Sequence, residues 1–485
     1  MAANPGSIPA PYGGWNTRDT LSSLPAEDAI TLTNFIPGVG SVDVREGYTQ
    51  HQAVTDASGN DINVDSLFEY HSGSTRKLIA AAGGELWDAT STPSSLASVY
   101  SSDLWNGVMF KDRLFLFNGA DTSKDFDGTT VNTTTWTGIV TSNLIDVTVH
   151  KGRLYMIEKE SLSFWYPAAG GVSGALSEFD LSTIAKFGGH LLTAHAWTHD
   201  GGSGPDDYIA FITDKGEAIV YQGDDPSTAA DWSLVGVYRI GVPINRRSII
   251  KTNGDLLIAT ASDYVYMSTV LRTGGLGSAS KLSGAIQSEF VNKSLDGWQL
   301  IIFNAGDLII SNIPQADSTY DQHVLNAVTG AACKFEGLDS RCWTVYDDEL
   351  YFGSTGAINK YGGDDDGGSA IESKARQAWI DNGIRQRISA VRPVFTYTGT
   401  VDYGFKVDYD YRESLPQYTA SLEILGASWD TATWDVSSWG GTATSSKWRA
   451  SSGTGQSFSI NFASRTEANL SWNRTDLRLE GGRNL

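Results

Sequence analysis

One local pattern recurs seven times after residue 65 and limits the folds that the chain can adopt. Each copy is an apolar strand, a tight polar turn, and a second strand rich in aromatic or β-branched residues. The turns contain Gly, Asn or Asp, for which a positive φ costs little, so each copy predicts a β-hairpin. The copies cover residues 76–90, 105–119, 144–158, 207–223, 247–268, 298–312 and 341–362.

The spacing of these hairpins favours a β-propeller. They recur at roughly 28 to 64 residues, a range that includes the ~40–50 residues of typical blades. A hairpin alone cannot bury both of its faces, whereas radial repetition buries them and protects the sheet edges. We therefore expect an all-β chain with a propeller of six or seven blades. A pair of β-sandwiches is the alternative that periodicity leaves open.

The character of the sequence changes at the charged, Gly-rich segment GGDDDGGS (362–369). Beyond it, alternating strands and Trp residues in a Ser/Thr/Gly-rich context predict a β-sandwich-like domain. The predicted division is an extended N-terminal arm with the first strands (1–64), the propeller (65–362), a linker (363–369) and the C-terminal domain (370–485). Two Gly- and Ser-rich stretches, 167–206 and 271–296, are expected to be insertions between blades.

The formal net charge of −21 disfavours a conventional nucleic-acid reader, because such a surface repels phosphate. The same charge suits either plain solubility or a channel that lets DNA pass without binding it. The two cysteines, Cys333 and Cys342, are expected to be free thiols. We see neither a secretory signal nor an apolar run long enough for a membrane anchor, and expect a soluble product made in a cytoplasm.

Several short motifs approximate functional sites, and for each we expect a structural role instead. Residues 201–209 match one calcium-binding nonapeptide, but that mechanism needs stacked copies. Residues 428–434 approximate a sialidase-type Asp-box with the Gly missing. The histidine spacing is irregular for a metal site, and no pair of carboxylates is selected by spacing. We expect no catalytic, metal-binding or cofactor-binding residues. The histidines are His190, His195 and His199, and the acidic clusters are Asp206-Asp207, Asp224-Asp225 and Asp364 to Asp366.

Arginines gather at two places in this acidic chain. Such local basic patches suit docking against carboxylates of a neighbouring molecule, or ordinary ion pairs within the chain. One group is Arg385, Arg387 and Arg392, for which Asp381, Asp402 and Asp408 are possible partners; the other is Arg239, Arg246 and Arg247.

The stretch 12–48 carries a resemblance to a known family. Its elements are Gly13 to Asp19, Pro25 with Asp28-Ala29, Leu32 to Pro37, and Val42 to Tyr48. This order resembles the N-terminus of a large group of phage virion proteins, with Trp15 where Leu is usual. The end LEGGRNL (479–485), preceded by a strand with Trp472, also resembles the close of these proteins. Their characterised relatives are the DNA-stabilising tail-hub, or nozzle, proteins of short-tailed phages.

The resemblance implies a structural role in a virion, without enzymatic activity or cofactor. The subunit would form a homohexameric ring below the portal and its adaptor, extend and close the DNA exit channel, and retain packaged DNA until ejection. Its partners would be itself, the tail adaptor and portal complex, and tail fibres or spikes. Genomic DNA would pass through the lumen without sequence-specific binding. The chain would be synthesised in the host cytoplasm and reside in the phage tail.

The extended arm has two possible positions. It can staple the assembly by lying across its own fold or a neighbour, or it can close its own propeller as an outer strand; both can hold. The residues expected to contact another subunit or the adaptor are Trp15, Arg18, Asp19, Phe35, Pro37, Arg45, Arg385 and Arg387.

Two alternatives from other functional classes remain. A tail-associated carbohydrate-binding or carbohydrate-degrading propeller would need carboxylates at the propeller axis or a Trp-lined cleft, which the Trp residues between Trp429 and Trp448 could supply. A passive receptor-binding module would bind cells as an isolated protein.

Overall fold

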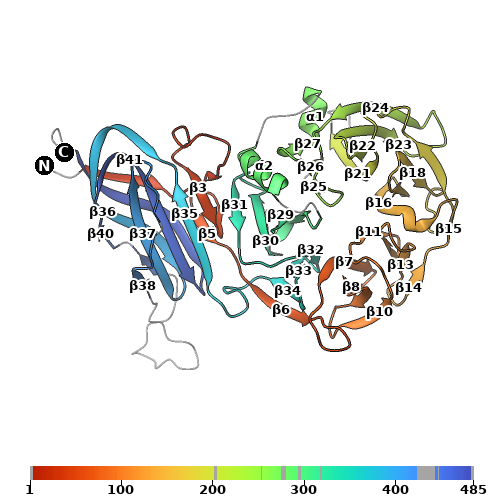
Figure 1. The fold of residues 1–485 in the computed structure, drawn as a ribbon, viewed down its shortest axis with the longest axis horizontal. Helices are drawn as coiled ribbons and strands as arrows, with labels where there is room; N and C mark the ends of the chain where they lie inside the picture. The colour runs from red at the N-terminus through yellow and green to blue at the C-terminus, as the bar shows by residue number, and fades with distance from the viewer. Residues whose placement is uncertain are drawn as a thin grey trace.

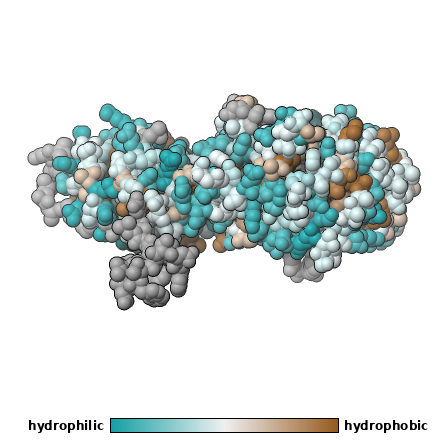
Figure 2. All heavy atoms as spheres, turned by 90° about the horizontal axis from the view of Figure 1, so that it is seen from below, coloured by the Kyte–Doolittle hydropathy of each residue, from teal (hydrophilic) through white to brown (hydrophobic). Residues whose placement is uncertain are grey.

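The protein consists of two β-rich lobes lying side by side, a ring of blades and a two-layered lobe (Figure 1). A view from below shows the same two lobes in a row, with the exposed hydrophobic side chains of that face gathered mainly on the ring (Figure 2). The computed structural model describes residues 4–200, 205–252, 254–274, 280–292, 296–316, 319–414, 416–422, 443–445 and 447–481.

The predicted hairpins are present, and their turns use the expected backbone geometry. Lys151 and Gly152 have φ of 45° and 72° in one turn, and Asp347 and Asp348 have φ of 51° and 62° in another. Successive positive φ values match the twist of the flanking strands, which is why such residues connect them tightly.

The first three blades follow one another along the chain. Each is an antiparallel sheet of four strands. A short parallel pair, β15 (Trp136–Thr137) with β19 (Gly174–Ala175), and the turn η1 (Thr141–Asn143) accompany the third blade. The blade strands are β7 (Val64–Ser72), β8 (Thr75–Ala82), β9 (Glu85–Asp88), β10 (Ser94–Ser98); β11 (Asn106–Phe110), β12 (Arg113–Phe117), β13 (Lys124–Phe126), β14 (Val131–Thr133); β16 (Leu144–His150), β17 (Arg153–Glu158), β18 (Ser163–Tyr166) and β20 (Ser177–Asp180).

The next three groups continue the ring. The fourth blade has four strands, the fifth has three and is followed by two helices, and the sixth is a four-stranded meander that also joins the large sheet of the other lobe. Their elements are β21 (Leu191–Asp200), β22 (Pro205–Thr213), β23 (Glu217–Gly223), β24 (Trp232–Arg239); β25 (Ile249–Thr252), β26 (Asp255–Ala259), β27 (Tyr264–Tyr266), α1 (Met267–Thr273), α2 (Ser283–Asn292); β28 (Gln299–Phe303), η2 (Asn304–Gly306), β29 (Leu308–Pro314), β30 (Tyr320–Asn326) and β31 (Ala332–Phe335).

The last blade is built from both parts of the chain. Strands β32 (Cys342–Tyr346), β33 (Glu349–Gly353) and β34 (Ala357–Tyr361) are completed by β6 (Tyr48–Ala53), which pairs antiparallel with β34. The first strands of the seven groups contact one another in a closed circle, in the order β7, β11, β16, β21, β25, β28, β32 and back to β7. The expected propeller is therefore confirmed, with six blades as separate sheets and the β28–β31 meander as a seventh.

Apolar side chains hold neighbouring blades together. Between the third and fourth blades, the rings of Phe164 and Phe211 stack with their centroids 4.2 Å apart, and Tyr155 stacks on Trp232 with a centroid distance of 5.7 Å. Burying such rings supplies most of the stabilisation of a blade interface, since each aromatic side chain removes a large apolar area from water.

The second lobe has the expected β-sandwich-like form. Strand β36 pairs with β42 along most of its length and with β41 near its start, so it passes from one layer to the other. Phe395, Phe462 and Trp472 meet between the layers, with Phe462 and Trp472 5.0 Å apart. The strands are β35 (Ile371–Gln377), β36 (Ile380–Tyr397), β37 (Val401–Tyr409), β38 (Ala420–Leu422), β39 (Ala443–Ser445), β40 (Arg449–Ala450), β41 (Thr454–Thr466) and β42 (Leu470–Gly481).

The N-terminal arm runs between the lobes and pairs with both. Strand β3 lies antiparallel to β35 of the sandwich and touches β31 of the propeller through Thr33 and Lys334. Strands β1 and β5 both pair with β42. Of the two positions considered for the arm, residues 48–53 close the propeller and the preceding residues join the two lobes. The arm strands are β1 (Asn4–Pro9), β2 (Gly14–Trp15), β3 (Asp28–Thr33), β4 (Phe35–Pro37) and β5 (Val42–Val44).

The expected insertion at 167–206 requires a correction. This stretch contains β20, the outer strand of the third blade, and β21, the inner strand of the fourth. Its many Gly and Ser residues interrupt the alternation of short strands, which hid them in the sequence. The second expected insertion, 271–296, contains α2, and the helices follow a blade of three strands instead of four.

Gly47 provides a test of the arm's close packing. A Cβ added at Gly47 would lie 1.7 Å from the backbone oxygen of Asp365, whereas at Gly38 its nearest neighbour would be 3.6 Å away. We expect Gly47→Ala to lower the free energy of unfolding by about 1–3 kcal/mol, because the backbone of residue 365 must shift. Gly38→Ala should leave it nearly unchanged. Urea denaturation of both variants checks this, and equal midpoints would contradict the close approach.

Candidate functional sites: the arm junction and the axial pocket

Asn34 lies at the centre of the junction between the arm and both lobes. Its backbone is left-handed, with φ 56°, a conformation that Asn tolerates better than most residues. Its side-chain amide donates to the carbonyls of Glu336 and Glu372, at 3.1 and 2.8 Å, in the propeller and the sandwich respectively. Its Oδ1 accepts from the backbone N–H of Glu336 and from Nε of Arg45.

Arg45 is buried beside Asn34, with its side chain fully shielded from solvent. Its Nη1 and Nη2 donate to the two carboxylate oxygens of Asp366, at 2.8 and 2.7 Å. It also donates to the carbonyls of Glu46 and Glu336. A forked guanidinium–carboxylate pair is among the strongest polar contacts that a protein makes. Asp366 belongs to the predicted linker 363–369, which is thereby attached to the arm.

Three more of the expected contact residues serve the interior of the same chain. Trp15 donates from Nε1 to the carbonyl of Ile30 at 3.1 Å and packs edge-on against the ring of His323. Phe35 is fully buried, and buried Pro37 accepts at its carbonyl from Asn326. The side chains of Phe35, Pro37 and Arg45 are enclosed within the chain in this structure, and their expected contact with another subunit stays a prediction.

The other four expected contact residues remain accessible. Arg18 and Asp19 form an ion pair at 2.8 Å on the surface of the arm. The hydrogen bond from Arg18 lowers the pKa of Asp19 to about 2, with further help from Asn16. Arg385 and Arg387 are exposed on β36. Arg18 and Asp19 lie on the arm, whereas Arg385 and Arg387 lie on a strand of the sandwich.

The other motifs singled out in the sequence are dispersed. His195 is half-buried and hydrogen-bonded to Thr193, and its partial desolvation lowers its pKa. His190 lies beside Asp214. Asp225 pairs with Arg153 at 3.1 Å, and Asp207 accepts from Thr198. Across the ranges that the structure describes, no group of three or more His, Cys, Asp or Glu side chains could hold a metal ion.

Part of the carbohydrate alternative lies outside the described residues. These residues are the Asp-box-like segment 428–434, which includes Trp429 and Trp434, and Trp439. Residues 201–204 and 482–485 and the side chain of His199 also lie outside the described residues. Trp448 is described, and its ring centre lies 4.9 Å from the guanidinium carbon of Arg392 and 4.7 Å from that of Arg478. Its ring is thus already engaged by two cations within the chain.

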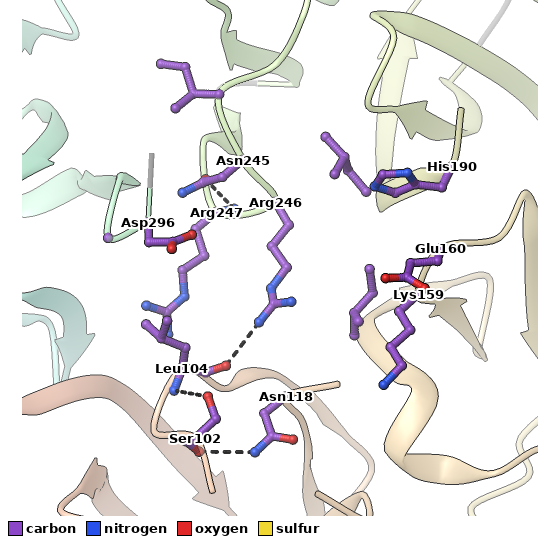
Figure 3. A pocket seen from close by; sticks show the side chains of 14 residues that line it. Ser102, Leu104, Asn118, Lys159, Glu160, His190, Asn245, Arg246, Arg247 and Asp296 are labelled. Atoms are coloured by element: carbon purple, nitrogen blue, oxygen red, sulfur yellow. Dashed lines mark hydrogen bonds between the residues drawn. The ribbon is translucent and has the colours of Figure 1, made fainter. Parts of the chain in front are cut away.

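A cavity of about 540 Å³ opens at one end of the propeller axis (Figure 3). It is lined by residues next to the inner strands of several blades, which is why residues distant in sequence meet there. The lining combines apolar side chains with a few polar and charged ones. The labelled residues of Figure 3 are Ser102, Leu104, Asn118, Lys159, Glu160, His190, Asn245, Arg246, Arg247 and Asp296.

Arg247 contributes to the cavity and reaches into the inner strands of the first two blades. It donates to the carbonyls of Asp65 and Trp105, at 3.0 and 2.7 Å, and to the side chains of Ser66 and Asn106. All four acceptors are neutral. Burial lowers the pKa of Arg247 to about 10, since the charged form loses its hydration.

Arg246 is the adjacent cation, and it extends across the cavity in Figure 3. Its Nη2 donates to the carbonyl of Leu104 at 3.1 Å. Among the described residues it makes no ion pair within 4.0 Å, and burial lowers its pKa while Asp146 and Asp296 act on it from a distance. The expected docking or ion-pairing role of these arginines is thus replaced by an axial one. Arg239, expected with them, stacks over Phe187.

The axial residues also connect neighbouring blades. Asn106 donates to Asp146 at 2.9 Å, and Thr193 donates to the other carboxylate oxygen of Asp146. Arg341 pairs with Asp65 at 2.7 Å, and Gln299 bonds the backbone of Trp343. Each link joins the inner strand of one blade to that of the next, or to the residue just before it. The sequence carries a faint signal for this cavity, since the doubled arginine directly precedes a predicted strand.

Cys333 and Cys342 are free and buried, as expected. Burial raises both thiol pKa values, that of Cys342 to about 12, so neither is a reactive nucleophile at neutral pH. Neither described helix is long and apolar enough to cross a membrane.

Comparison with known proteins yields likeness in fold alone. No protein-family model and no curated protein matches the sequence. Matching solved structures include the WD40 β-propeller domain of Doa1 (10% identity, 65% of this chain and 96% of that chain, TM-score 0.40). Another is YCF48 bound to D1 peptide, with 8% identity over 70% of this chain and 99% of that chain and a TM-score of 0.38. A third is BamB from Moraxella catarrhalis, with 11% identity over 68% of this chain and 93% of that chain and a TM-score of 0.34. The propeller assignment rests on the strand pairing described above.

The Arg45–Asp366 pair can be tested against an exposed ion pair. Arg45→Met leaves the Asp366 carboxylate without its cation, and we expect the free energy of unfolding to fall by about 3–5 kcal/mol. Arg76→Met, at an arginine paired with Glu69 but 46% exposed, should change it little. Chemical denaturation of both variants measures the difference. A loss for Arg45→Met no larger than for Arg76→Met would contradict the role of the junction.

His323 predicts how stability depends on pH. It is buried against Trp15, neither ring nitrogen has a hydrogen-bond partner among the described residues, and burial lowers its pKa from 6.5 to about 3. The unfolded chain therefore binds a proton below pH 6.5 that the folded chain rejects until about pH 3. Between these values, this group lowers the free energy of unfolding by about 1.4 kcal/mol for each unit by which the pH decreases.

The matched variants are His323→Leu and His71→Leu, the latter at an exposed histidine. Unfolding free energies measured from about pH 7 to pH 4 should show a shallower slope for His323→Leu alone. A wild-type slope retained by His323→Leu would show that His323 is protonated within the folded protein.

Proposed function

We propose that this protein is a structural subunit of a phage tail, forming a nozzle or hub ring that extends and closes the DNA exit channel. The observation that carries the proposal is the arm junction. The segment that resembles nozzle proteins, residues 12–48, is the segment that joins the propeller to the sandwich. A subunit in the wall of a channel must keep its domains in register under load, and strand pairing together with a buried ion pair provides such a connection.

The small size of the axial cavity, about 540 Å³, supports a channel between subunits. Arg247 and its hydrogen bonds to two blades occupy the axis next to the cavity. A duplex far wider than this space would have to pass through a lumen surrounded by several copies, which the sixfold ring of the proposal provides. The net charge of −21 suits such a lumen, since an acidic wall does not retain DNA.

The exposed members of the expected contact set are the proposed contacts with a neighbouring subunit or the adaptor. These are the Arg18–Asp19 pair on the arm and Arg385 with Arg387 on β36. In an acidic chain, exposed arginines have carboxylates available on every neighbouring copy. The proposal includes tail fibres or spikes as further partners, the phage tail as location, and no catalytic activity.

Copy number in the virion tests the proposal. Quantitative mass spectrometry of purified particles should give this chain at about half the number of portal subunits, as a sixfold ring below a twelvefold portal requires. The portal and major capsid protein serve as internal standards. Near-zero copies would contradict the structural role and favour the carbohydrate alternative, for which release of reducing sugar from host polysaccharide is the assay.

A further inference from the structure

We propose that the axial pocket is a binding site for a carboxylate, held by the guanidinium group of Arg246. The pocket is the cavity of about 540 Å³ described above, and nothing in the proposed tail role assigns a ligand to it. This inference stands apart from the proposed function, because it concerns the isolated subunit.

The first argument is that neither arginine of the cavity forms an ion pair among the described residues. Arg246 and Arg247 are adjacent in sequence, both line the cavity, and their hydrogen bonds go to neutral acceptors. Both side chains are half-buried, and withdrawing a cation from water is costly unless an anion accompanies it. The pKa values of both guanidinium groups are lowered because the charged form has lost part of its hydration. Asp146 and Asp296 act on Arg246 from beyond ion-pair distance, whereas an anion in the cavity could contact its guanidinium group directly.

The second argument concerns donor geometry. Arg247 already uses Nε, Nη1 and Nη2 within the first two blades. Arg246 donates one hydrogen bond within the described structure, which leaves further N–H groups of its fork for a ligand. The fork of a guanidinium matches the two oxygens of a carboxylate. Arg246 is therefore the anchor, and Arg247 contributes positive potential from behind it.

The third argument selects the class of anion. Glu160 and Asp296 also line the cavity, and Asp146 is close enough to act on Arg246. These carboxylates repel a second negative charge, so a monoanionic carboxylate fits better than a phosphate dianion. Ser102 offers a hydroxyl group, and Leu104, Ile145 and Leu192 offer apolar surface. A ligand with hydroxyl, amide or methylene groups beside its carboxylate matches this lining.

Two sources could present such a carboxylate, a small organic acid or an acidic side chain of a peptide segment. The full-length chain is therefore titrated calorimetrically, at low salt, with glucuronate and with acetyl-Gly-Glu-Gly-amide. Glucose and acetyl-Gly-Gln-Gly-amide are the neutral counterparts, and inorganic phosphate tests the anion class. We expect saturable binding of at least one carboxylate probe, no binding of its neutral counterpart, and weaker binding of phosphate. Binding of glucuronate without binding of the peptide would identify a small acid as the source of the carboxylate. Binding of the Glu peptide more tightly than glucuronate would identify an acidic side chain as the source.

Variants locate the site. Arg246→Gln should weaken the carboxylate probe at least about tenfold, because a charge-assisted hydrogen bond is lost. Glu160→Gln, at an exposed turn residue of the rim, should tighten it by removing repulsion. Lys215→Gln, exposed and outside the cavity, is the matched control. If Arg246→Gln fails to fold, Arg246→Lys and Glu160→Gln carry the test. Three results would each overturn the proposal. They are the absence of saturable carboxylate binding, phosphate binding as strong as carboxylate binding, and a carboxylate affinity that the folded cavity variants do not change.

Discussion

The buried fork between Arg45 and Asp366 is the contact on which the relation of the two lobes depends. Arg45 is followed three residues later by β6, which completes the last blade, and it is preceded by β5, which pairs with β42 of the sandwich. Asp366 lies between that blade and the sandwich. One guanidinium therefore fixes the place where the chain crosses from propeller to sandwich in both directions. Since the pair is shielded from water, its strength is screened little by salt.

This junction changes the meaning of the domain division. By sequence the arm, propeller, linker and C-terminal domain follow one another. In space, the arm is part of both lobes, through β3 with β35 and through β6 with β34. A chain built in this way resists separation of its lobes more strongly than two domains joined by one tether, because several strand pairs must break together.

The sequence predicted what local chemistry determines and missed what depends on distant contacts. The hairpin of β16 and β17, which turns between His150 and Arg153, is one example. It follows from the turn residues and from the alternation of apolar and polar residues, which are local features of the sequence. Strand β21 escaped notice because the Gly-rich segment beside it resembled a loop. Arg45 and Asp366 are 321 residues apart, and no local pattern pairs them. The axial pocket was missed for the same reason: Arg246 meets Leu104 only because the ring closes, which placed these arginines in a different role from the one expected.

The position of β1 has a consequence for the order of events during synthesis. Its partner, β42, contains the last described residues of the chain, and β6 waits for β34 at residues 357–361. Strands β1 and β6 are therefore synthesised long before their partners. They remain as unpaired edges while hundreds of residues are added, a state open to pairing with the wrong chain. The sandwich and the last blade can therefore be completed only after β42 and β34 have been synthesised, and not blade by blade as the chain emerges.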